Sequence, residues 1–101
     1  MTEKELQRLI MDYLAVKRIF HYRNNSGVMF SEYKGKKRMV RFGATGSPDI
    51  IVVQNGIYVG IEVKNPTAVQ NEAQVAFQQE LEKAGGKYIL ARSLDDVIKF
   101  I

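Results

Sequence analysis

The stretch from Ser47 to Lys64, SPDIIVVQNGIYVGIEVK, constrains the fold more than any other part of the chain. It contains two apolar runs, 50–53 and 57–61, on either side of an Asn55-Gly56 pair. An Asn-Gly pair between two such runs is the strongest short-range signal of a β-hairpin, because a type I′ turn needs positive φ at both central positions. The sequence therefore predicts an antiparallel strand pair joined by a tight turn.

Two acidic residues face each other at the open end of this predicted hairpin. Counting outward from the turn places Ile50 opposite Ile61, and then Asp49 opposite Glu62. Directly opposed side chains have Cβ atoms about 4.5–5.5 Å apart, a separation at which like charges repel. Period-two alternation adds the Lys64 ammonium to the same face. A strand pair that is otherwise apolar has no folding reason to end in this way, so we expect a cation between the two carboxylates.

The cation that suits two carboxylates at this position is Mg²⁺, with Mn²⁺ as a second choice. Mg²⁺ takes oxygen ligands and is commonly held by one or two carboxylates together with a substrate phosphate. Asp49 and Glu62 would hold it, and Lys64 would orient the attacking hydroxide or stabilise the developing negative charge. This set of groups is typical of phosphodiester hydrolysis. The alternative is a strand-end salt-bridge cluster, which contributes only about 0–1 kcal/mol at a surface.

Composition narrows the class of protein. At 101 residues the chain predicts a single domain, residues 1–101, small enough that a homodimer would help to bury more surface. Its net charge of +4 favours an anionic partner, and its lack of Cys excludes disulfides and fits a reducing cytosol. No apolar run approaches the roughly 20 residues of a membrane span, and the charged start is no signal peptide. We therefore expect a cytoplasmic protein with no membrane contact, for example in a phage or bacterial host.

Helical and alternating periods predict the remaining elements. In chain order these are a helix from Thr2 to about Val16, a strand over 19–23, a second hairpin with arms 28–33 and 39–42, a helix within 67–84, a strand over 87–91 and a short last helix from Ser93. The connection from Glu62 to the strand over 87–91 is long enough for a right-handed crossover between parallel strands. The predicted fold class is α/β, a mixed sheet with helices packed on it.

The first and last predicted helices begin with the same signature. Thr2 with Glu5 forms a capping box, and Ser93 with Asp96 repeats it. Glu3 stands at helical spacing from the apolar face of the first helix, so we expect it to project from the buried side. The alternative for Glu3 is a carboxylate that only complements the helix dipole.

Several motifs together resemble a known nuclease superfamily. Pro48-Asp49 followed by Glu62-Val63-Lys64 resembles the motif of PD-(D/E)xK nucleases, whose shared restriction-endonuclease-like core is an αβββαβ arrangement with helices on a mixed sheet. Other stretches narrow the resemblance to the virus-type replication-repair nuclease (VRR-NUC) branch. They are Glu3-x-x-Leu6-Gln7, Arg23-Asn24-Asn25-Ser26-Gly27, Gly46-Ser47-Pro48-Asp49 and Gln74. The resemblance spans nearly the whole chain.

The resemblance implies a role for each matched residue. Asp49 and Glu62 would be metal ligands, and the backbone carbonyl of Val63 would be a third. Lys64 would be the catalytic lysine, and Glu3 would reach into the site from the first helix. Members of this branch act on DNA in repair and phage contexts. The small stand-alone members resemble homodimers that cut branched DNA such as four-way junctions.

The helix within 67–84 supplies one further candidate. Its apolar face begins at Val69, and the resemblance selects Gln74 to assist catalysis. Gln70 and Gln78 lie at helical spacing from Gln74, so the periodicity alone leaves the choice among the three open.

Basic residues near the second hairpin form the predicted DNA-binding surface, which would recognise backbone and shape instead of sequence. Together with one amide, they are Arg23, Asn25, Lys34, Lys36, Lys37, Arg38 and Arg41. A solvated hairpin tip is the alternative for the run 34–41. Tyr22 beside Arg23 would stack on bases, although core or rim packing explains it equally well. His21 is the only histidine, and we interpret it as a partly buried strand residue that touches a backbone group.

These observations favour a Mg²⁺-dependent DNA endonuclease, structure-selective for branched DNA, in repair or recombination. The alternative from another class is a catalytically silent nucleic-acid-binding module of the same fold. A third option is a metal hydrolase of nucleotides or small phosphate esters. For that option the small-residue loop 43–47 leaves room beside Asp49, but the basic hairpin has no obvious purpose.

Overall fold

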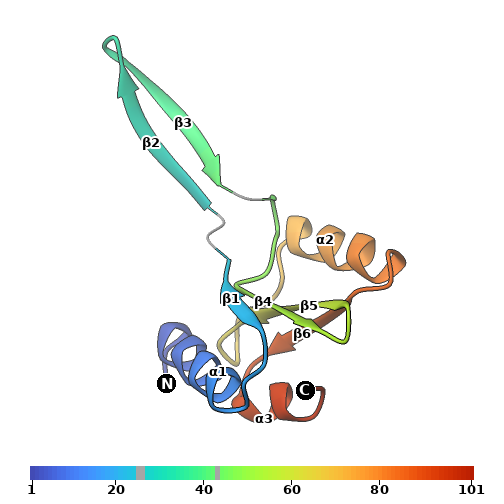
Figure 1. The fold of residues 1–101 in the computed structure, drawn as a ribbon. Coiled ribbons are helices and arrows are strands. Elements are labelled where there is room, and N and C mark those ends of the chain that lie inside the picture. Colours follow the sequence, from blue (N-terminus) through green and yellow to red (C-terminus); the bar gives the residue numbers. More distant parts are fainter. Residues whose placement is uncertain (25–26, 43) are drawn as a thin grey trace.

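The computed structural model describes residues 1–24, 27–42 and 44–101, and within 27–33 and 38–42 it describes the backbone alone. Three helices and a mixed four-stranded sheet in this part of the chain make a small α+β protein, as Figure 1 shows. The elements are α1 (Glu3–Val16), β1 (His21–Arg23), β2 (Gly27–Tyr33), β3 (Lys36–Phe42), β4 (Ile50–Gln54), β5 (Ile57–Val63), α2 (Glu72–Lys83), β6 (Lys87–Ala91) and α3 (Leu94–Ile98).

Helix α1 has a polar cap and one apolar face. The Glu5 N–H donates to the Thr2 hydroxyl at 3.1 Å, and the Thr2 N–H donates to the Glu5 carboxylate at 3.3 Å. The predicted capping box is therefore confirmed. Leu6, Ile10 and Leu14 follow at helical spacing and are buried. This face fastens α1 to the sheet.

The sheet has the strand order β1-β4-β5-β6. Strand β4 pairs antiparallel with both β1 and β5, whereas β6 lies parallel to β5. The parallel pair is joined through α2, so the predicted crossover is confirmed. Strand β1 is shorter than the predicted run 19–23, because only His21–Arg23 pair with β4.

The sheet lies between two helical layers (Figure 1). Helices α1 and α3 cover one face, where Ile50, Ile61 and Ile89 belong to the hydrophobic core. Helix α2 covers part of the other face, and none of its residues is fully buried. Because Ile61 points into the core, alternation turns Glu62 toward the α2 side. Among the described residues, no helix has the length and apolar composition needed to span a bilayer.

The β4–β5 hairpin has the register that the sequence predicts. Gln54 pairs with Ile57 and Ile50 pairs with Ile61. Asn55 has a φ of 54° and Gly56 a φ of 77°, so both turn residues are in the left-handed region that a type I′ turn requires. The last ladder pair leaves Asp49 and Glu62 at the open end.

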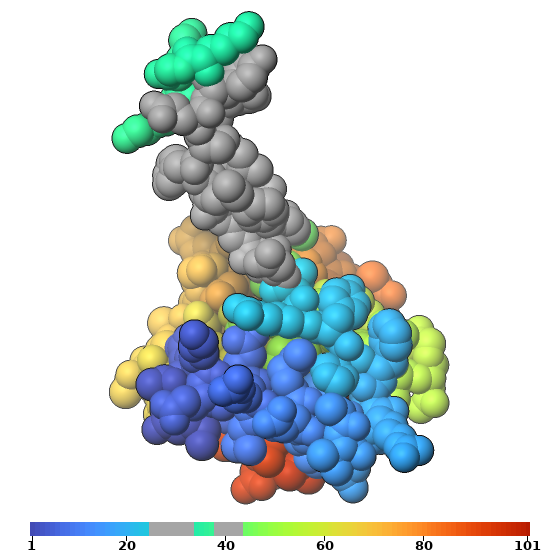
Figure 2. All heavy atoms as spheres, turned by 60° about the vertical axis from the view of Figure 1, so that its left-hand side comes forward, coloured from blue at the N-terminus to red at the C-terminus, as the bar shows by residue number. Residues whose placement is uncertain are grey.

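Strands β2 and β3 form a two-stranded sheet of their own. They project from the body as a ribbon, visible at the top of Figure 1, and Figure 2 shows the coloured tip, residues 34–37, far from the rest of the molecule. The second hairpin was expected to turn over the four residues 34–37. The strands instead reach Tyr33 and Lys36, so only Lys34 and Gly35 connect them, with φ values of 52° and 74°.

Two predictions about the helices are wrong. Val69 precedes α2 and is 77% exposed, because Asn71 accepts the Gln74 N–H at 2.9 Å and starts the helix later. Ser93 does precede α3, but its side chain makes no capping hydrogen bond. The Asp96 carboxylate accepts the backbone N–H of Arg92 at 2.9 Å instead.

Candidate metal and phosphodiester site

Asp49 is fixed by backbone groups of the two neighbouring strands. Its Oδ2 accepts the Val63 N–H at 2.9 Å, and its carbonyl oxygen accepts the Asn24 N–H at 2.8 Å. The carboxylate is thus held against the end of β5, as the register predicts. The resemblance implies that the Val63 carbonyl is a metal ligand. In the structure, it is the Val63 N–H that contacts Asp49.

Glu62 is buried at 4% exposure, which is unusual for a carboxylate. Its Oε1 accepts a hydrogen bond from Gln74 Nε2 at 3.0 Å. Its Oε2 is also buried and, among the described residues, accepts no hydrogen bond from an N–H or O–H donor, but the Glu62 carboxyl group is within hydrogen-bonding reach of the Asp49 carboxyl group when one of the two is protonated. When both carboxyl groups are charged, Glu62 Oε2 has no donor in the described part of the chain, which costs free energy unless a cation binds there.

The two carboxylates hold their protons unusually tightly. Burial, and after it the charge of Asp49, raises the pKa of Glu62 to about 8. Burial also raises the pKa of Asp49, against the lowering effect of the Val63 N–H. The Lys64 charge lowers both pKa values, so the structure brings Lys64 close to both acids. A divalent cation bound here would also lower the pKa values of Asp49 and Glu62.

Helix α2 distinguishes among the three candidate glutamines. Gln74 is the one that contacts Glu62, and its Oε1 also accepts the Asn71 N–H at 2.9 Å. Gln70 donates to Gln78 at 3.0 Å instead. The capping box of α2 therefore also orients the amide that holds Glu62.

Glu3 lies at the rim of the site and not on the buried side as predicted. It is exposed, and its Oε1 accepts the Asn65 N–H at 3.0 Å, just beyond Lys64. Its charge raises the pKa of both Asp49 and Glu62, so it is near the acid pair. The start of α1 projects from the sheet edge here, which leaves Glu3 in solvent while Leu6 enters the core.

A cavity of about 250 Å³ opens beside Lys64. It lies between the start of α1, the loop after β5 and the start of α3, and Glu3, Lys64 and Arg92 line it among others. A larger groove of about 520 Å³ follows the outer side of α1 as far as Arg23, but Asp49, Glu62 and Lys64 do not line it. The smaller cavity therefore borders Lys64 and Glu3, whereas neither Asp49 nor Glu62 lines either space.

Asn24 is a positioning residue that sequence reasoning missed. Its side-chain amide donates to the Ser47 hydroxyl and, at 3.0 Å, to the Pro48 carbonyl. Gly46 supports the same loop, with a φ of 80° and no space for a Cβ, which would meet the Ala73 carbonyl oxygen of α2. The loop before Asp49 is thus fastened to β1 on one side and to α2 on the other.

Arg92 and Tyr88 were also not predicted. Arg92 Nη1 donates to the carbonyls of Asn65 and Ala68, both at 2.7 Å, and so fixes the loop that follows Lys64. Tyr88 pairs with Gly60 on β5, and its buried hydroxyl lies near Gln70. Burial raises the pKa of Tyr88 to about 12, against the lowering effect of the Gln70 side chain. Only the parallel register of β6 places it here, and no local sequence signal encodes that register.

The predicted DNA-binding residues that the structure describes lie in two places, the tip of the ribbon and β1, and on β1 Arg23 pairs with Ile50, next to Asp49. Lys34, Lys36 and Lys37 are exposed at the far end of the ribbon, and Arg23 is exposed on the edge strand β1. Asn25 lies outside the described residues, as do the side chains of Arg38 and Arg41. His21 agrees with its interpretation, because its Nδ1 lies 2.7 Å from the Ile19 carbonyl oxygen.

The side chains present suit a hard divalent cation for which the protein supplies only some of the ligands. Among the described residues, no group of three or more His, Cys, Asp or Glu side chains is placed to bind a metal. The donor set is the pair Asp49 and Glu62, whose adjacent carboxyl groups a cation would hold in place of a shared proton. Mg²⁺ is commonly bound by one or two carboxylates, water and substrate phosphate, so this pair fits that ion.

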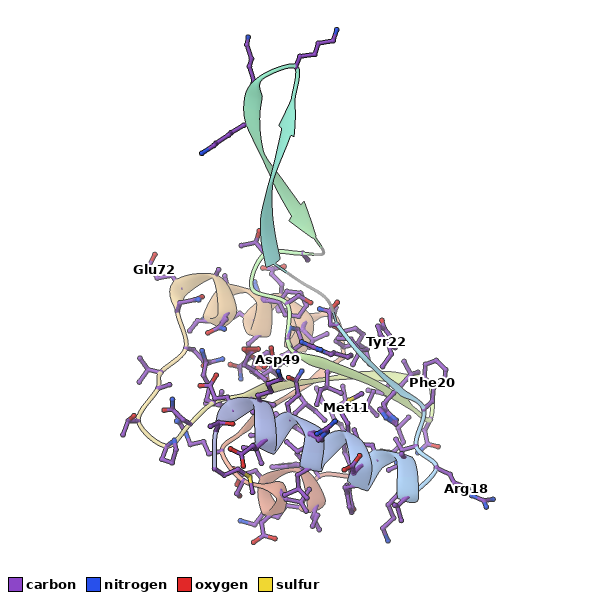
Figure 3. All side chains as sticks on the ribbon, turned by 90° about the vertical axis from the view of Figure 1, so that its left-hand side faces the viewer. Met11, Arg18, Phe20, Tyr22, Asp49 and Glu72 are labelled. Carbon is purple, nitrogen blue, oxygen red and sulfur yellow. The ribbon has the colours of Figure 1, made fainter. Side chains whose placement is uncertain are left out.

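Figure 3 shows Asp49 between α1 and α2, below the base of the ribbon. The candidate site is therefore built from the adjoining ends of the central strands β4 and β5 and from the starts of the helices α1 and α2. No protein-family model matches the chain, and a search of curated proteins finds no match to it.

Proposed function

We propose that the protein is a divalent-metal-dependent endonuclease that hydrolyses phosphodiester bonds in DNA. The observation that carries the proposal is the buried carboxyl group of Glu62, which is paired with the Asp49 carboxyl group at one strand end beside Lys64 and whose Oε2 accepts no hydrogen bond from an N–H or O–H donor of the described residues. A carboxylate in this position weakens the folded state when it is charged. Groups held at such a cost, with strongly raised pKa values, are typical of functional sites.

In this proposal Asp49 and Glu62 hold Mg²⁺ or Mn²⁺, with the Val63 carbonyl as a further ligand. Polarisation of the scissile phosphate and acidification of the attacking water are the chemistry that such an ion supplies when bound. Asp49 is kept in place by the Val63 N–H, and Glu62 by Gln74, so neither carboxylate must reorganise as charge develops.

Lys64 stabilises the negative charge that builds on the phosphoryl oxygens while the water oxygen bonds to phosphorus and the bond to the leaving sugar oxygen breaks. The attacking water loses a proton to solvent, and the leaving oxygen takes one from solvent. Gln74 orients Glu62, and Glu3 acts at the rim, where its bond to the Asn65 N–H fixes the backbone next to Lys64. These roles divide the work between orientation and electrostatic stabilisation.

The element order supports a restriction-endonuclease-like core. Without the ribbon, the order α1, β1, β4, β5, α2 and β6 reads αβββαβ, which is the arrangement implied by the sequence resemblance. On this interpretation the ribbon is an insertion between β1 and β4. The resemblance also suggests branched DNA, such as four-way junctions, and a homodimer that would supply two sites to one junction.

A catalytically silent binding module is the competing proposal. Binding of a phosphate backbone needs positive charge and gains nothing from a buried acid pair. A binder would be more stable with amides at Asp49 and Glu62. The cost of the acid pair therefore favours an enzyme.

The decisive experiment is a cleavage assay on linear, flapped and four-way-junction DNA, with Mg²⁺, with Mn²⁺ and with neither. We expect cleavage that requires metal and is strongest on branched DNA. Lys64→Ala should reduce the rate at least about 100-fold, since one preorganised electrostatic contact commonly contributes that much. Lys87→Ala is the matched control, because Lys87 is exposed and lies on β6, away from the acid pair.

Two results would reject the nuclease. One is no cleavage of any substrate by a folded protein, which would favour the binding module. The other is equal cleavage by Lys64→Ala and wild type. Thermal unfolding of each variant shows that a lost rate is not a lost fold.

A further inference from the structure

The uncovered part of the sheet carries exposed aromatic rings. Phe20 is 67% exposed and Tyr22 49% exposed, and their ring centroids lie 6.4 Å apart at an interplanar angle of 74°. Val53, 39% exposed, and the half-buried Tyr58 adjoin them, because Val53 pairs with Tyr58 and its N–H donates to the Phe20 carbonyl at 3.2 Å. We call these four residues the aromatic patch.

The aromatic patch lies on the same sheet face as the acid pair. Tyr22 pairs with Ile51, and Asp49 precedes Ile51 by two residues, so alternation puts Tyr22 and Asp49 on one side. In Figure 3, Tyr22 lies between Asp49 and Phe20, and Arg18 lies beyond Phe20. The strand that bears the rings is also fastened to the site, through the bond from the Asn24 N–H to the Asp49 carbonyl.

Positive charges border the aromatic patch. Lys17 and Arg18 are exposed at the start of the segment that carries Phe20 and Tyr22, whereas Arg23 faces the α1 side of the sheet, where it lines the groove along that helix. The sequence from 13 to 31 contains no Asp or Glu. Exposed rings interleaved with cations are the surface that single-stranded nucleic acid requires, because bases stack on the rings while cations meet the phosphates.

We infer that the aromatic patch is a stacking platform for unpaired nucleobases of DNA next to the scissile phosphate. The assignment to DNA depends on the proposed nuclease function. Duplex bases already stack on one another, so the platform selects single-stranded segments, as at a flap or an opened junction. It thus gives a physical basis for a preference for branched substrates.

A second copy of the chain is a poorer occupant of this surface. A two-fold interface places the same patch of each copy against the other. The cations Lys17 and Arg18 of both copies would then approach one another, and like charges brought together oppose association.

The test is binding of fluorescently labelled oligothymidylate and of a hairpin duplex of equal length, both in EDTA so that no cleavage occurs. Phe20→Ala and Tyr22→Ala should each weaken oligothymidylate binding roughly 5- to 150-fold, the loss of one stacked base. Duplex binding should change less than about twofold. Tyr22→Phe keeps the ring and should bind like wild type. Phe100→Ala is the matched control, because Phe100 is also 67% exposed.

A second measurement reports stacking directly. A 2-aminopurine base in the oligonucleotide should change its fluorescence on binding to wild type and much less on binding to Tyr22→Ala. Three results would overturn the inference. They are unchanged oligothymidylate affinity in both alanine variants, an equal loss for duplex and single strand, and a dimer in sedimentation that Phe20→Ala dissociates. Because cleavage is not measured, a protein that stacks bases but never cuts fails only the nuclease proposal.

Discussion

The β4–β5 hairpin and the β2–β3 ribbon are both antiparallel pairs closed by two residues with positive φ. Asn55 and Gly56 close the first, and Lys34 and Gly35 close the second. The first is buried between two helical layers and ends in the acid pair, whereas the second is a separate two-stranded sheet outside the body. The comparison teaches that turn chemistry defines a hairpin, while burial decides whether its register must be exact enough to position a site.

The largest expected effect comes from lengthening each turn by one glycine. An insertion between Asn55 and Gly56 shifts the register of β4 against β5, and a one-residue slip moves buried side chains such as Ile50 to the other face. We expect the free energy of unfolding to fall by at least ~2 kcal/mol, the usual minimum for one lost large core residue, and cleavage to be abolished. Urea unfolding and the junction assay measure the two effects.

The same insertion between Lys34 and Gly35 is the control. The ribbon pairs only with itself, so its lengthening should change stability by less than about 1 kcal/mol and leave the acid pair intact. Equal losses from the two insertions would break the comparison, and so would cleavage that survives the longer Asn55-Gly56 turn.

An effect of intermediate size on the unfolding free energy is expected from the acid pair at the end of the β4–β5 hairpin. The ribbon has no such pair among its described side chains. The folded state raises the pKa of Glu62 from 4.5 to about 8, so it binds this proton more tightly than the unfolded chain. The resulting stability is fully present below pH ~4.5 and is lost as pH rises through about 8. Without metal, wild type should therefore lose more unfolding free energy between pH 5 and 8 than Glu62→Gln, by on the order of a few kcal/mol.

Urea unfolding in EDTA at several pH values measures this difference. Added Mn²⁺ should restore the stability of wild type at pH 8 but not that of Glu62→Gln, because a ligand that binds only the folded state stabilises it by mass action. Parallel pH profiles of the two proteins would show that Glu62 is not strained by its burial.

The smallest effect on stability is expected at the tip of the ribbon. Lys36→Ala and Lys37→Ala remove exposed charges and should change the unfolding free energy by less than about 0.5 kcal/mol. Each should nevertheless reduce the slope of log affinity against log salt by about 1 if the lysine contacts a DNA phosphate. Lys99→Ala, another exposed lysine, is the control. An unchanged slope in the tip variants would leave the ribbon without a role in DNA binding.

The sequence predicted the β4–β5 register because two local rules, alternation and the Asn55-Gly56 turn, determine it without reference to the rest of the fold. It also predicted the contact of Asp49 with the end of β5, which follows from that register. The start of α2 was misplaced because Asn71 competes as a cap with earlier polar residues that have similar propensity. A short-range pattern does not decide such a competition.

Other features depend on contacts between distant parts of the chain. The Asn24 amide acts on Ser47 and Pro48, and the Tyr88 hydroxyl is enclosed only because β6 pairs with β5 in one particular register. Alternation in β2 and β3 indicates a hairpin, but it does not show that this hairpin forms a sheet of its own. These partners are chosen by the packing of the whole molecule, so the sequence pattern of one segment contains no signal for them.

The close approach of Gly46 to the Ala73 carbonyl makes the loop before Asp49 and the first turn of α2 one mechanical unit. A side chain at position 46 must push the helix away, and Gln74 moves with the helix and releases Glu62. A Gly46→Ala protein would keep every proposed catalytic residue and still lose their alignment on warming. Position 46 is therefore the natural place for a temperature-sensitive allele, in which activity is switched off by heat before the sheet itself unfolds.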